Sequence, residues 1–156
     1  MGRRGEFKDF YYMFIGEYQH SLDDKGRLAI PYKFRALLKK GCIIAKGLDG
    51  CLFLYTKTEW QSLAQELAKR TFNRANNRTI SRYFLASATD LKFDTQGRVT
   101  ISNYLRKFAN LKKTVIIVGL YDRLEIWDEM AWNKYKAQTE KQTETIAETL
   151  DHLNNQ

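Results

Sequence analysis

The chain has 156 residues, of which 44% are hydrophobic and 13% aromatic, a composition that supports a packed core and excludes wholesale disorder. Its longest apolar runs, such as "CLFLY" and "TVIIVGL", are far shorter than a membrane helix, and its first residues lack the apolar core of a signal peptide. We therefore expect a soluble cytoplasmic protein with no membrane partner. The net charge of +8, from 26 Lys and Arg against 18 Asp and Glu, favours a polyanionic partner, nucleic acid first. A basic surface without such a partner explains the charge equally well.

In chain order, residues 1–12, "MGRRGEFKDFYY", are expected to be an N-terminal extension. A strand is expected over residues 14–22, because polar and apolar side chains alternate there with a period of two, which places one set on one face of a sheet. A polar turn, "DDKGR", follows at residues 23–27, where Gly26 can adopt a positive φ angle. A second short strand leaves this turn.

Residues 31–41, "PYKFRALLKKG", are expected to form a short helix with Pro31 in its first turn and Gly41 at its end. Two strands and a helix that begins near residue 56 complete the unit. The same order then recurs. Its elements are a strand at 86–93, the turn "DTQGR" at 94–98, a short strand, a helix at 102–111 capped by Ser102, strands at 114–120 and 123–127, and a helix beginning near residue 128.

The chain therefore contains an internal duplication. Asp94 follows Asp23 by 71 residues (94 − 23), and several other residues match at the same separation. These matches are Gly26 with Gly97, Arg27 with Arg98, Ile30 with Ile101 and Arg35 with Arg106; at a separation of 72, Gly47, Leu48, Leu52 and Trp60 match Gly119, Leu120, Leu124 and Trp132. A unit of roughly 45 residues has a small core of its own. We expect the two units to pack as a pseudo-dimer, each covering the apolar sheet face of the other.

The repeated polar turn has two interpretations. An Asp before a Gly-containing turn often caps backbone amides, and the Arg that follows can be merely solvated. That interpretation does not require an Arg, yet Arg27 and Arg98 recur at the same place, and Lys25 adds another cation to the first turn. A planar guanidinium held by Asp23 or Asp94 can bind two acceptors at once, such as guanine O6 and N7 or two phosphate oxygens.

A second basic feature lies between the two units. Arg70, Arg74, Arg78 and Arg82 recur every four residues, so on one continuous helix they would form a stripe. Such a stripe is either a solvated face or a surface for an anionic partner. Glu140, Glu144 and Glu148 have the same spacing near the C-terminus, beside an apolar set of Ile146, Leu150 and Leu153. We expect this acidic segment to dock on the basic one, between subunits, so that charge reversal at Glu144 and Glu148 weakens assembly.

The sequence offers no support for an enzyme. Cys42, Cys51, His20 and His152 lack the spacing of zinc ligands, and both cysteines lie beside apolar runs, where buried free thiols are expected. The chain has neither a Gly-rich phosphate loop nor a nucleophile elbow. We predict no catalytic residue, no metal, no cofactor and no small-molecule substrate.

Several of these segments together resemble the bacterial MraZ family, over residues 13 to about 150. They are "MFIGEYQHSLDDKGRLAIPYKFR", "GLDGCLFLYTKTEW", "RYFLASATD", "DTQGRVTI" and "VGLYDRLEIWDEMAW". The resemblance implies an α+β fold in which a pseudo-twofold tandem pair of AbrB/SpoVT-like swapped-hairpin β units is fused in one chain, each followed by a helix. The expected divisions are 17–59 for the first unit, 60–87 for a connecting helical segment, 88–131 for the second unit and 132–156 for a helical tail.

The same resemblance implies a sequence-specific, DNA-binding transcriptional regulator of a division and cell-wall gene cluster, which represses its own operon and associates with the nucleoid. It implies binding of double-stranded promoter DNA with G-rich direct repeats, and homo-oligomers in the form of rings. The DNA-contacting motifs of the family fall on residues 23–27 and 94–98, so the expected site comprises Asp23, Lys25, Gly26, Arg27, Asp94, Gly97 and Arg98. Gln96 stands where the first turn has Lys25, which puts equal contributions in question. The alternative is an assembly or antitoxin-like module that binds another protein.

Overall fold

The computed structural model describes residues 13–155, and the expected N-terminal extension lies outside them. The first half contains β1 (Phe14–Ser21), β2 (Arg27–Ala29), α2 (Tyr32–Leu38), β3 (Cys42–Lys46), β4 (Leu52–Thr56), α3 (Lys57–Lys69) and α4 (Ala75–Ser87). The second half contains β5 (Thr89–Leu91), β6 (Arg98–Thr100), α5 (Asn103–Phe108), β7 (Thr114–Tyr121), β8 (Leu124–Asp128), α6 (Glu129–Glu140) and α7 (Thr143–Asn154). The predicted α+β fold of two tandem units is confirmed, while the exact domain divisions stay predictions.

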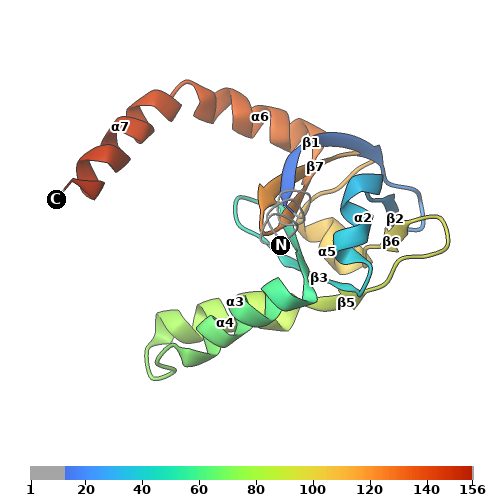
Figure 1. The fold of residues 1–156 in the computed structure, drawn as a ribbon, viewed down its shortest axis with the longest axis horizontal. Helices are drawn as coiled ribbons and strands as arrows, with labels where there is room; N and C mark the ends of the chain where they lie inside the picture. Colours follow the sequence, from blue (N-terminus) through green and yellow to red (C-terminus); the bar gives the residue numbers. More distant parts are fainter. Residues whose placement is uncertain (1–12, 156) are drawn as a thin grey trace, which may run out of the picture.

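The strands of the two halves interleave. A six-stranded antiparallel sheet has the order β1-β7-β8-β4-β3-β5, and β2 and β6 form a separate two-stranded ribbon (Figure 1). Both pairings that join equivalent strands are symmetric: Leu28 lies opposite Val99, and Phe53 lies opposite Glu125. Each of these pairs joins residues that the duplication matches, at separations of 71 and 72. The pseudo-twofold axis therefore passes through the middle of the ribbon and of the large sheet.

This interleaving corrects the expected pseudo-dimer, in which each unit would cover the sheet face of the other. The first strand of each half pairs instead with the third strand of the other half, β1 with β7 and β5 with β3. Pairing β4 with β8 then joins all six strands edge to edge. Backbone N–H and C=O groups at the edge of a strand need hydrogen-bond partners. The exchange supplies these partners along β3, β4, β7 and β8, so that among the described strands only β1 and β5 are edge strands of the sheet.

Two apolar clusters lie on opposite faces of the large sheet. The first packs the sheet against the β2–β6 ribbon, α2 and α5, and its fully buried members include Leu28, Ile30, Phe34, Val99, Ile101 and Leu105. The second packs the sheet against α3, α4 and α6 through Phe53, Phe84, Trp127 and their neighbours. One face of the β2–β6 ribbon therefore packs against the core, and its other face points away from the core.

Several helix ends form where the sequence predicts them. The Ser102 hydroxyl accepts a hydrogen bond from the Leu105 amide at 3.3 Å, as an N-cap does. Gly41 has a φ angle of 107° just beyond α2, and Pro31 immediately precedes that helix. The strand expected at 86–93 is wrong at its start, because α4 continues to Ser87 and the strand covers only Thr89–Leu91. The Lys46 amide donates to the buried Ser87 hydroxyl at 3.0 Å, which ties the end of α4 to β3.

The expected stripe of four arginines on one helix is also wrong. Helix α3 ends at Lys69 and α4 begins at Ala75, so Arg70 and Arg74 lie at the helix ends, and Arg78 and Arg82 alone share a helix. The connection is stabilised locally: the Asn77 side chain donates to the Thr71 carbonyl at 2.8 Å, and Arg78 Nη1 donates to the Phe72 carbonyl at 2.9 Å. These two bonds close a turn that helical periodicity could not reveal.

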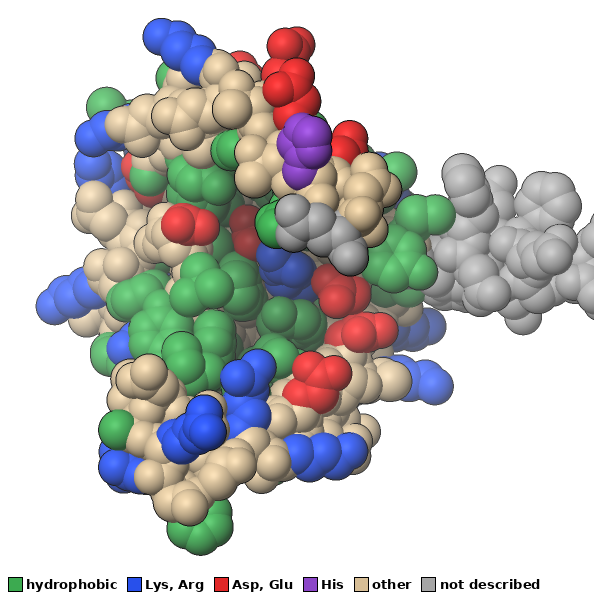
Figure 2. Space-filling model, turned by 90° about the vertical axis from the view of Figure 1, so that its left-hand side faces the viewer, with side chains coloured by type: hydrophobic (Ala, Val, Ile, Leu, Met, Phe, Trp, Pro, Cys, Tyr) green, Lys and Arg blue, Asp and Glu red, His purple; other side chains and the backbone are tan. Residues whose placement is uncertain are grey.

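The α3–α4 hairpin and the α6–α7 arm both extend from the sheet, and α7 lies far from the hairpin (Figure 1). The acidic segment therefore does not dock on the basic one within a single chain. Hydrophobic side chains gather in the hollow between the hairpin and the arm (Figure 2). Among the residues that the structure describes, no helix has the length and apolar character needed to cross a membrane.

Candidate nucleic-acid interface

The first polar turn is held by the carboxylate of Asp23. Its Oδ1 accepts hydrogen bonds from the Lys25 amide at 3.0 Å and the Arg27 amide at 2.8 Å. Its Oδ2 accepts from Arg27 Nε at 2.5 Å. The Gly26 amide donates to the Asp23 carbonyl at 3.0 Å, and Gly26 has a φ angle of 80°, which favours glycine. One carboxylate thus fixes both the turn and the arginine that leaves it.

The second turn repeats this arrangement bond for bond. Asp94 Oδ1 accepts from the Gln96 amide at 2.8 Å and the Arg98 amide at 3.0 Å, and Asp94 Oδ2 accepts from Arg98 Nε at 2.8 Å. Gly97 has a φ angle of 74°, and its amide donates to the Asp94 carbonyl at 3.1 Å. The turn-capping interpretation and the arginine-holding interpretation are therefore compatible, because the two carboxylate oxygens divide the two tasks.

The hydrogen bonds also lower the pKa of both carboxyl groups. For Asp23 the largest cause is the bond from the Arg27 backbone amide, and for Asp94 it is the bond from the Arg98 amide. Hydrogen bonds to a carboxylate favour its charged form. Both aspartates are therefore ionised near neutral pH, as the ion pairs with Arg27 and Arg98 require.

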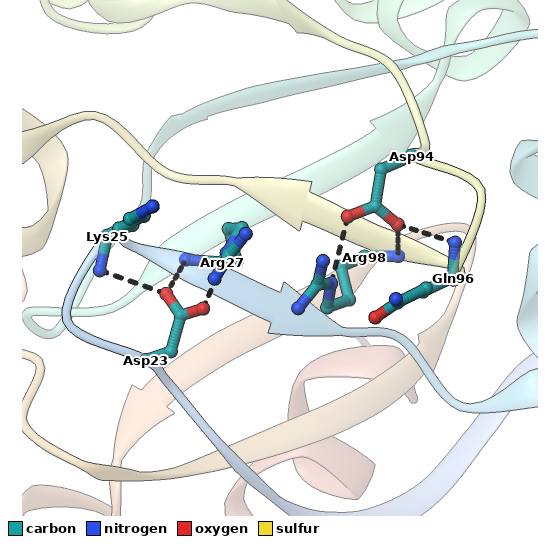
Figure 3. Close-up of polar contacts among 6 residues, drawn as sticks. All are labelled: Asp23, Lys25, Arg27, Asp94, Gln96 and Arg98. Carbon is teal, nitrogen blue, oxygen red and sulfur yellow. Dashed lines mark hydrogen bonds and ion pairs between the residues drawn. The ribbon is translucent and has the colours of Figure 1, made fainter.

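Both arginines project from the outward face of the ribbon. Leu28 and Val99 are fully buried beneath it, and side chains alternate along a strand, so the neighbouring Arg27 and Arg98 face away from the core. Figure 3 shows the two turns at opposite ends of the ribbon, with both arginines between the two aspartates. Arg27 lies opposite Thr100 and Arg98 opposite Ala29, so the two arginines are diagonal neighbours. The Cα atoms of diagonal neighbours in an antiparallel pair lie about 7–8 Å apart.

Each guanidinium keeps part of its hydrogen-bonding capacity. The bonds to Asp23 and Asp94 use Nε of Arg27 and Arg98. Within residues 13–155, the terminal nitrogens of these two side chains donate no hydrogen bond. Their side chains are 35% and 25% exposed, respectively. A planar fork of donors is therefore oriented and accessible, which suits an acceptor pair on a ligand.

The structure adds two arginines to the neighbourhood that the sequence did not assign to it. Arg35 of α2 packs against Gly97 of the second turn, and Arg106 of α5 packs against Gly26 of the first. The duplication matches these two arginines with each other, which was the available signal. Sequence distance concealed it, since each arginine lies in the half opposite to the turn that it contacts.

The remaining predicted residues lie apart from this site. Cys42 and Cys51 are buried free thiols, as expected, and burial raises the pKa of Cys42 to about 12. No group of three or more His, Cys, Asp or Glu side chains within residues 13–155 is arranged to hold a metal ion. Arg78 and Arg82 lie on the hairpin, away from the ribbon (Figure 1).

Comparison with known proteins gives a consistent result. The sequence model of the family described as "MraZ protein, putative antitoxin-like" matches the chain twice, over residues 13–83 and 84–154. A "Transcriptional regulator MraZ" from Desulforamulus reducens is 44% identical over 141 residues, which cover 90% of this chain and 99% of that protein. One of the same name from Pelotomaculum thermopropionicum is 44% identical over 142 residues, covering 91% and 98%. Another from Pediococcus pentosaceus is 44% identical over 138 residues, covering 88% and 96%.

Proposed function

The chain belongs to the MraZ family, and on that premise we propose that it is a transcriptional regulator that reads promoter DNA through Arg27 and Arg98. The observation that carries the proposal is the pair of guanidinium groups on one outward ribbon face, each fixed through Nε by its own aspartate. Holding the side chain before binding reduces the conformational entropy that binding would otherwise cost.

The ribbon suits the major groove of DNA. That groove admits a two-stranded β-ribbon, and guanine presents O6 and N7 there as a pair of acceptors for one arginine. The Cα atoms of diagonal neighbours such as Arg27 and Arg98 are about 7–8 Å apart, which corresponds to roughly two base-pair steps of about 3.4 Å. Two such contacts would favour G-rich sites, in keeping with the expected direct repeats. Repression of its own operon and association with the nucleoid belong to the same proposal and rest on the family resemblance.

The test is a fluorescence-anisotropy titration against a duplex from the region upstream of this gene and a scrambled duplex of equal length. Wild-type protein should prefer the upstream duplex. Arg27→Ala and Arg98→Ala should each weaken binding to it by about 1–3 kcal/mol, the usual cost of losing a bidentate base contact. Lys134→Ala, which removes one positive charge from the exposed face of α6, is the matched control. Equal binding of both duplexes by the wild type would contradict the proposal.

Self-association is the second part of the proposal, and a specific observation favours it. Ile146, Leu150 and Leu153 of α7 are 48%, 55% and 62% exposed. On a helix, Glu144 and Glu148 lie about half a turn from this apolar stripe, so the acids and the stripe face different directions. We infer that the stripe, rather than the acidic face, is the main contact with a second copy.

The surface that suits the stripe is a groove of about 280 Å³ on the α3–α4 hairpin, where Leu67, Phe72 and Leu85 supply apolar walls. Arg70, Arg78 and Arg82 also line it and would attract the acidic α7 at longer range. Because stripe and groove are different surfaces, such contacts run head to tail and can close into a ring.

Leu150→Asp should therefore lower the mass of the assembly measured by light scattering, and Glu144→Arg with Glu148→Arg should lower it less. An unchanged mass for Leu150→Asp would contradict the proposed contact. The antitoxin-like alternative predicts instead a different protein bound to the same stripe in stoichiometric amount.

A further inference from the structure

Beside each polar turn lies a basic pocket formed by the opposite half of the chain. Next to the second turn, a pocket of about 520 Å³ is lined by Asp94 and Gly97 together with Arg35 and Lys39 from the end of the first half's α2. Next to the first turn, a pocket of about 440 Å³ is lined by Asp23 and Asp24 together with Arg106, Lys112 and Lys113 from the second half. The duplication relates the two pockets through Asp23 and Asp94 and through Arg35 and Arg106, whereas their lysines do not lie at matched positions.

Backbone hydrogen bonds, as well as side chains, join each turn to the opposite half of the chain. The Ile101 amide donates to the Gly26 carbonyl at 2.8 Å, and the Ile30 amide donates to the Gly97 carbonyl at 3.3 Å. The helix that follows each of these isoleucines then carries an arginine back to the same glycine. The turn of one half is therefore fixed in position by the strand and helix of the other.

The arginines pack closely on these glycines. A methyl group added at Gly26 would lie 2.8 Å from Arg106 Nε, and one added at Gly97 would overlap Arg35 Cζ. Arg35 Nε donates to the Ile30 carbonyl at 2.8 Å, which fixes its direction. Arg106 Nε is buried and has no hydrogen-bond partner within residues 13–155. Arginine side chains thus form a wall of each pocket at the turn itself.

The cations that line the two pockets are not paired with carboxylates of residues 13–155. Within the described part of the chain, none of the ion pairs includes Arg35, Lys39, Arg106, Lys112 or Lys113. Of the carboxylates that line the two pockets, Asp23 and Asp94 are already bound to Arg27 and Arg98, and Asp24, beside the first pocket, is exposed. Lys39, Lys112 and Lys113 are exposed. An anion that approaches either pocket would therefore meet several cations that form no ion pair within residues 13–155, with Asp24 as the one unpaired carboxylate lining the first pocket there.

We propose that each pocket binds a phosphate of the DNA backbone, so that every turn reads a base with its own arginine and holds a neighbouring phosphate with cations from the opposite half. Arg106, Lys112 and Lys113 serve the first turn, and Arg35 and Lys39 serve the second. This inference rests on the proposed DNA-binding function. It assigns the second-half residues 106, 112 and 113 to contacts made beside Arg27, which lies about 80 residues earlier in the sequence.

The test uses the salt dependence of binding, because phosphate contacts set its slope and base contacts do not. Each phosphate neutralised on duplex DNA contributes about 0.9 to the slope of log K against log salt. Lys112→Ala with Lys113→Ala should therefore reduce the slope by about 1 to 2, and Lys39→Ala by about 1, on the upstream and the scrambled duplex alike. The preference between the two duplexes should stay that of the wild type. Lys134→Ala should leave the slope unchanged.

The energetic coupling between pocket substitutions and turn substitutions identifies the turn to which each pocket belongs. In double-mutant cycles, the lysine pair at 112 and 113 should couple with Arg27→Ala and not with Arg98→Ala, since the pocket that they line adjoins the first turn. A wild-type slope in the lysine variants, or coupling with Arg98 instead, would overturn the inference. Failure of the proposed base reading has a different signature: the wild type would bind both duplexes alike, while the salt slope would still respond to the lysines. A wild type that binds neither duplex would overturn both.

Discussion

The two polar turns of this molecule have the same hydrogen bonds but different numbers of charged side chains and different supports. Residues 23–27 contain two aspartates, a lysine and an arginine, and residues 94–98 contain one aspartate and one arginine, so each turn has a net charge of zero (2 − 2 and 1 − 1). The extra Lys25 of the first turn is therefore balanced by its neighbour Asp24. What the duplication preserves is the geometry that holds an arginine, and not the number of charged side chains around it.

The supports of the two turns differ more than the turns themselves. Strand β1 leads into the first turn and pairs with β7 over 8 residues, whereas β5 leads into the second and covers only 3 residues. The Leu22 amide also donates to the Lys113 carbonyl at 2.8 Å, just before the first turn. The first turn is thus attached along a long strand, and the second depends more on contacts from the opposite half.

The two turns should differ most in the unfolding free energy that is lost when their glycine is replaced by alanine. A methyl group at Gly26 would lie 2.6 Å from the Ile101 carbonyl oxygen, which belongs to the backbone, whereas at Gly97 the nearest atoms belong to the Arg35 side chain, which can move once its hydrogen bond to the Ile30 carbonyl breaks. Both φ angles are positive, so each Ala variant is strained. Gly26→Ala should lower the free energy of unfolding by about 3 kcal/mol and Gly97→Ala by about 1–2 kcal/mol. Urea denaturation measures both, and equal losses would show that the two turns are equally constrained.

The second-largest effect should be the loss of preference for the upstream duplex when the carboxylate charge of either turn is removed. Asp23→Asn and Asp94→Asn keep the size of the side chain but weaken the bond to Nε, which leaves Arg27 or Arg98 free to adopt other rotamers. Each should reduce the preference for the upstream duplex by roughly 1 kcal/mol, the typical net value of such a bond. Binding to a scrambled duplex should become slightly tighter, because an anion has been removed. An unchanged preference would mean that the aspartates only shape the turns.

Exchanging the residue that distinguishes the turns should have a smaller effect. Lys25→Gln makes the first turn resemble the second, and Gln96→Lys does the reverse. If Lys25 contacts a phosphate, the first change should lower the salt slope by about 1 and the second should raise it by a similar amount. Neither should alter the preference between duplexes. A changed preference would assign base reading to position 25 or 96.

The smallest effect concerns stability in acid. The pKa of each of Asp23 and Asp94 is lower in the folded protein than its ordinary value of 3.8, so their contribution to stability is fully present above that value. It is lost as the pH falls through the lowered pKa of the folded state. The wild type should therefore exceed the double Asn variant in unfolding free energy near pH 6, and the difference should shrink toward pH 2. A difference independent of pH would exclude the charge as its cause.

Much of this arrangement was predictable because it is local. The alternation in residues 14–22, the glycines of the turns and the Ser102 cap depend on near neighbours in sequence, and the duplication added the tandem architecture. The residues alone did not show which strands exchange between the halves, because several pairings satisfy the same strand edges, and only the family resemblance implied swapped hairpins. For that reason the contacts of Arg35 and Arg106 with the opposite turns were missed. The arginine stripe failed for a related reason, since the Asn77 and Arg78 side-chain bonds that end its periodicity are visible only in three dimensions.

The most direct test of the central claim is the ratio of affinities for the upstream and scrambled duplexes in Arg27→Lys and Arg98→Lys variants at fixed salt. Lysine retains the charge but loses the planar fork of donors and the bond through Nε. Each variant should keep the wild-type salt slope and lose at least several-fold in the ratio, by a similar factor because the two turns hold their arginines alike. A ratio unchanged in both variants would show that these arginines supply only charge, and would contradict the reading of DNA bases by the two turns.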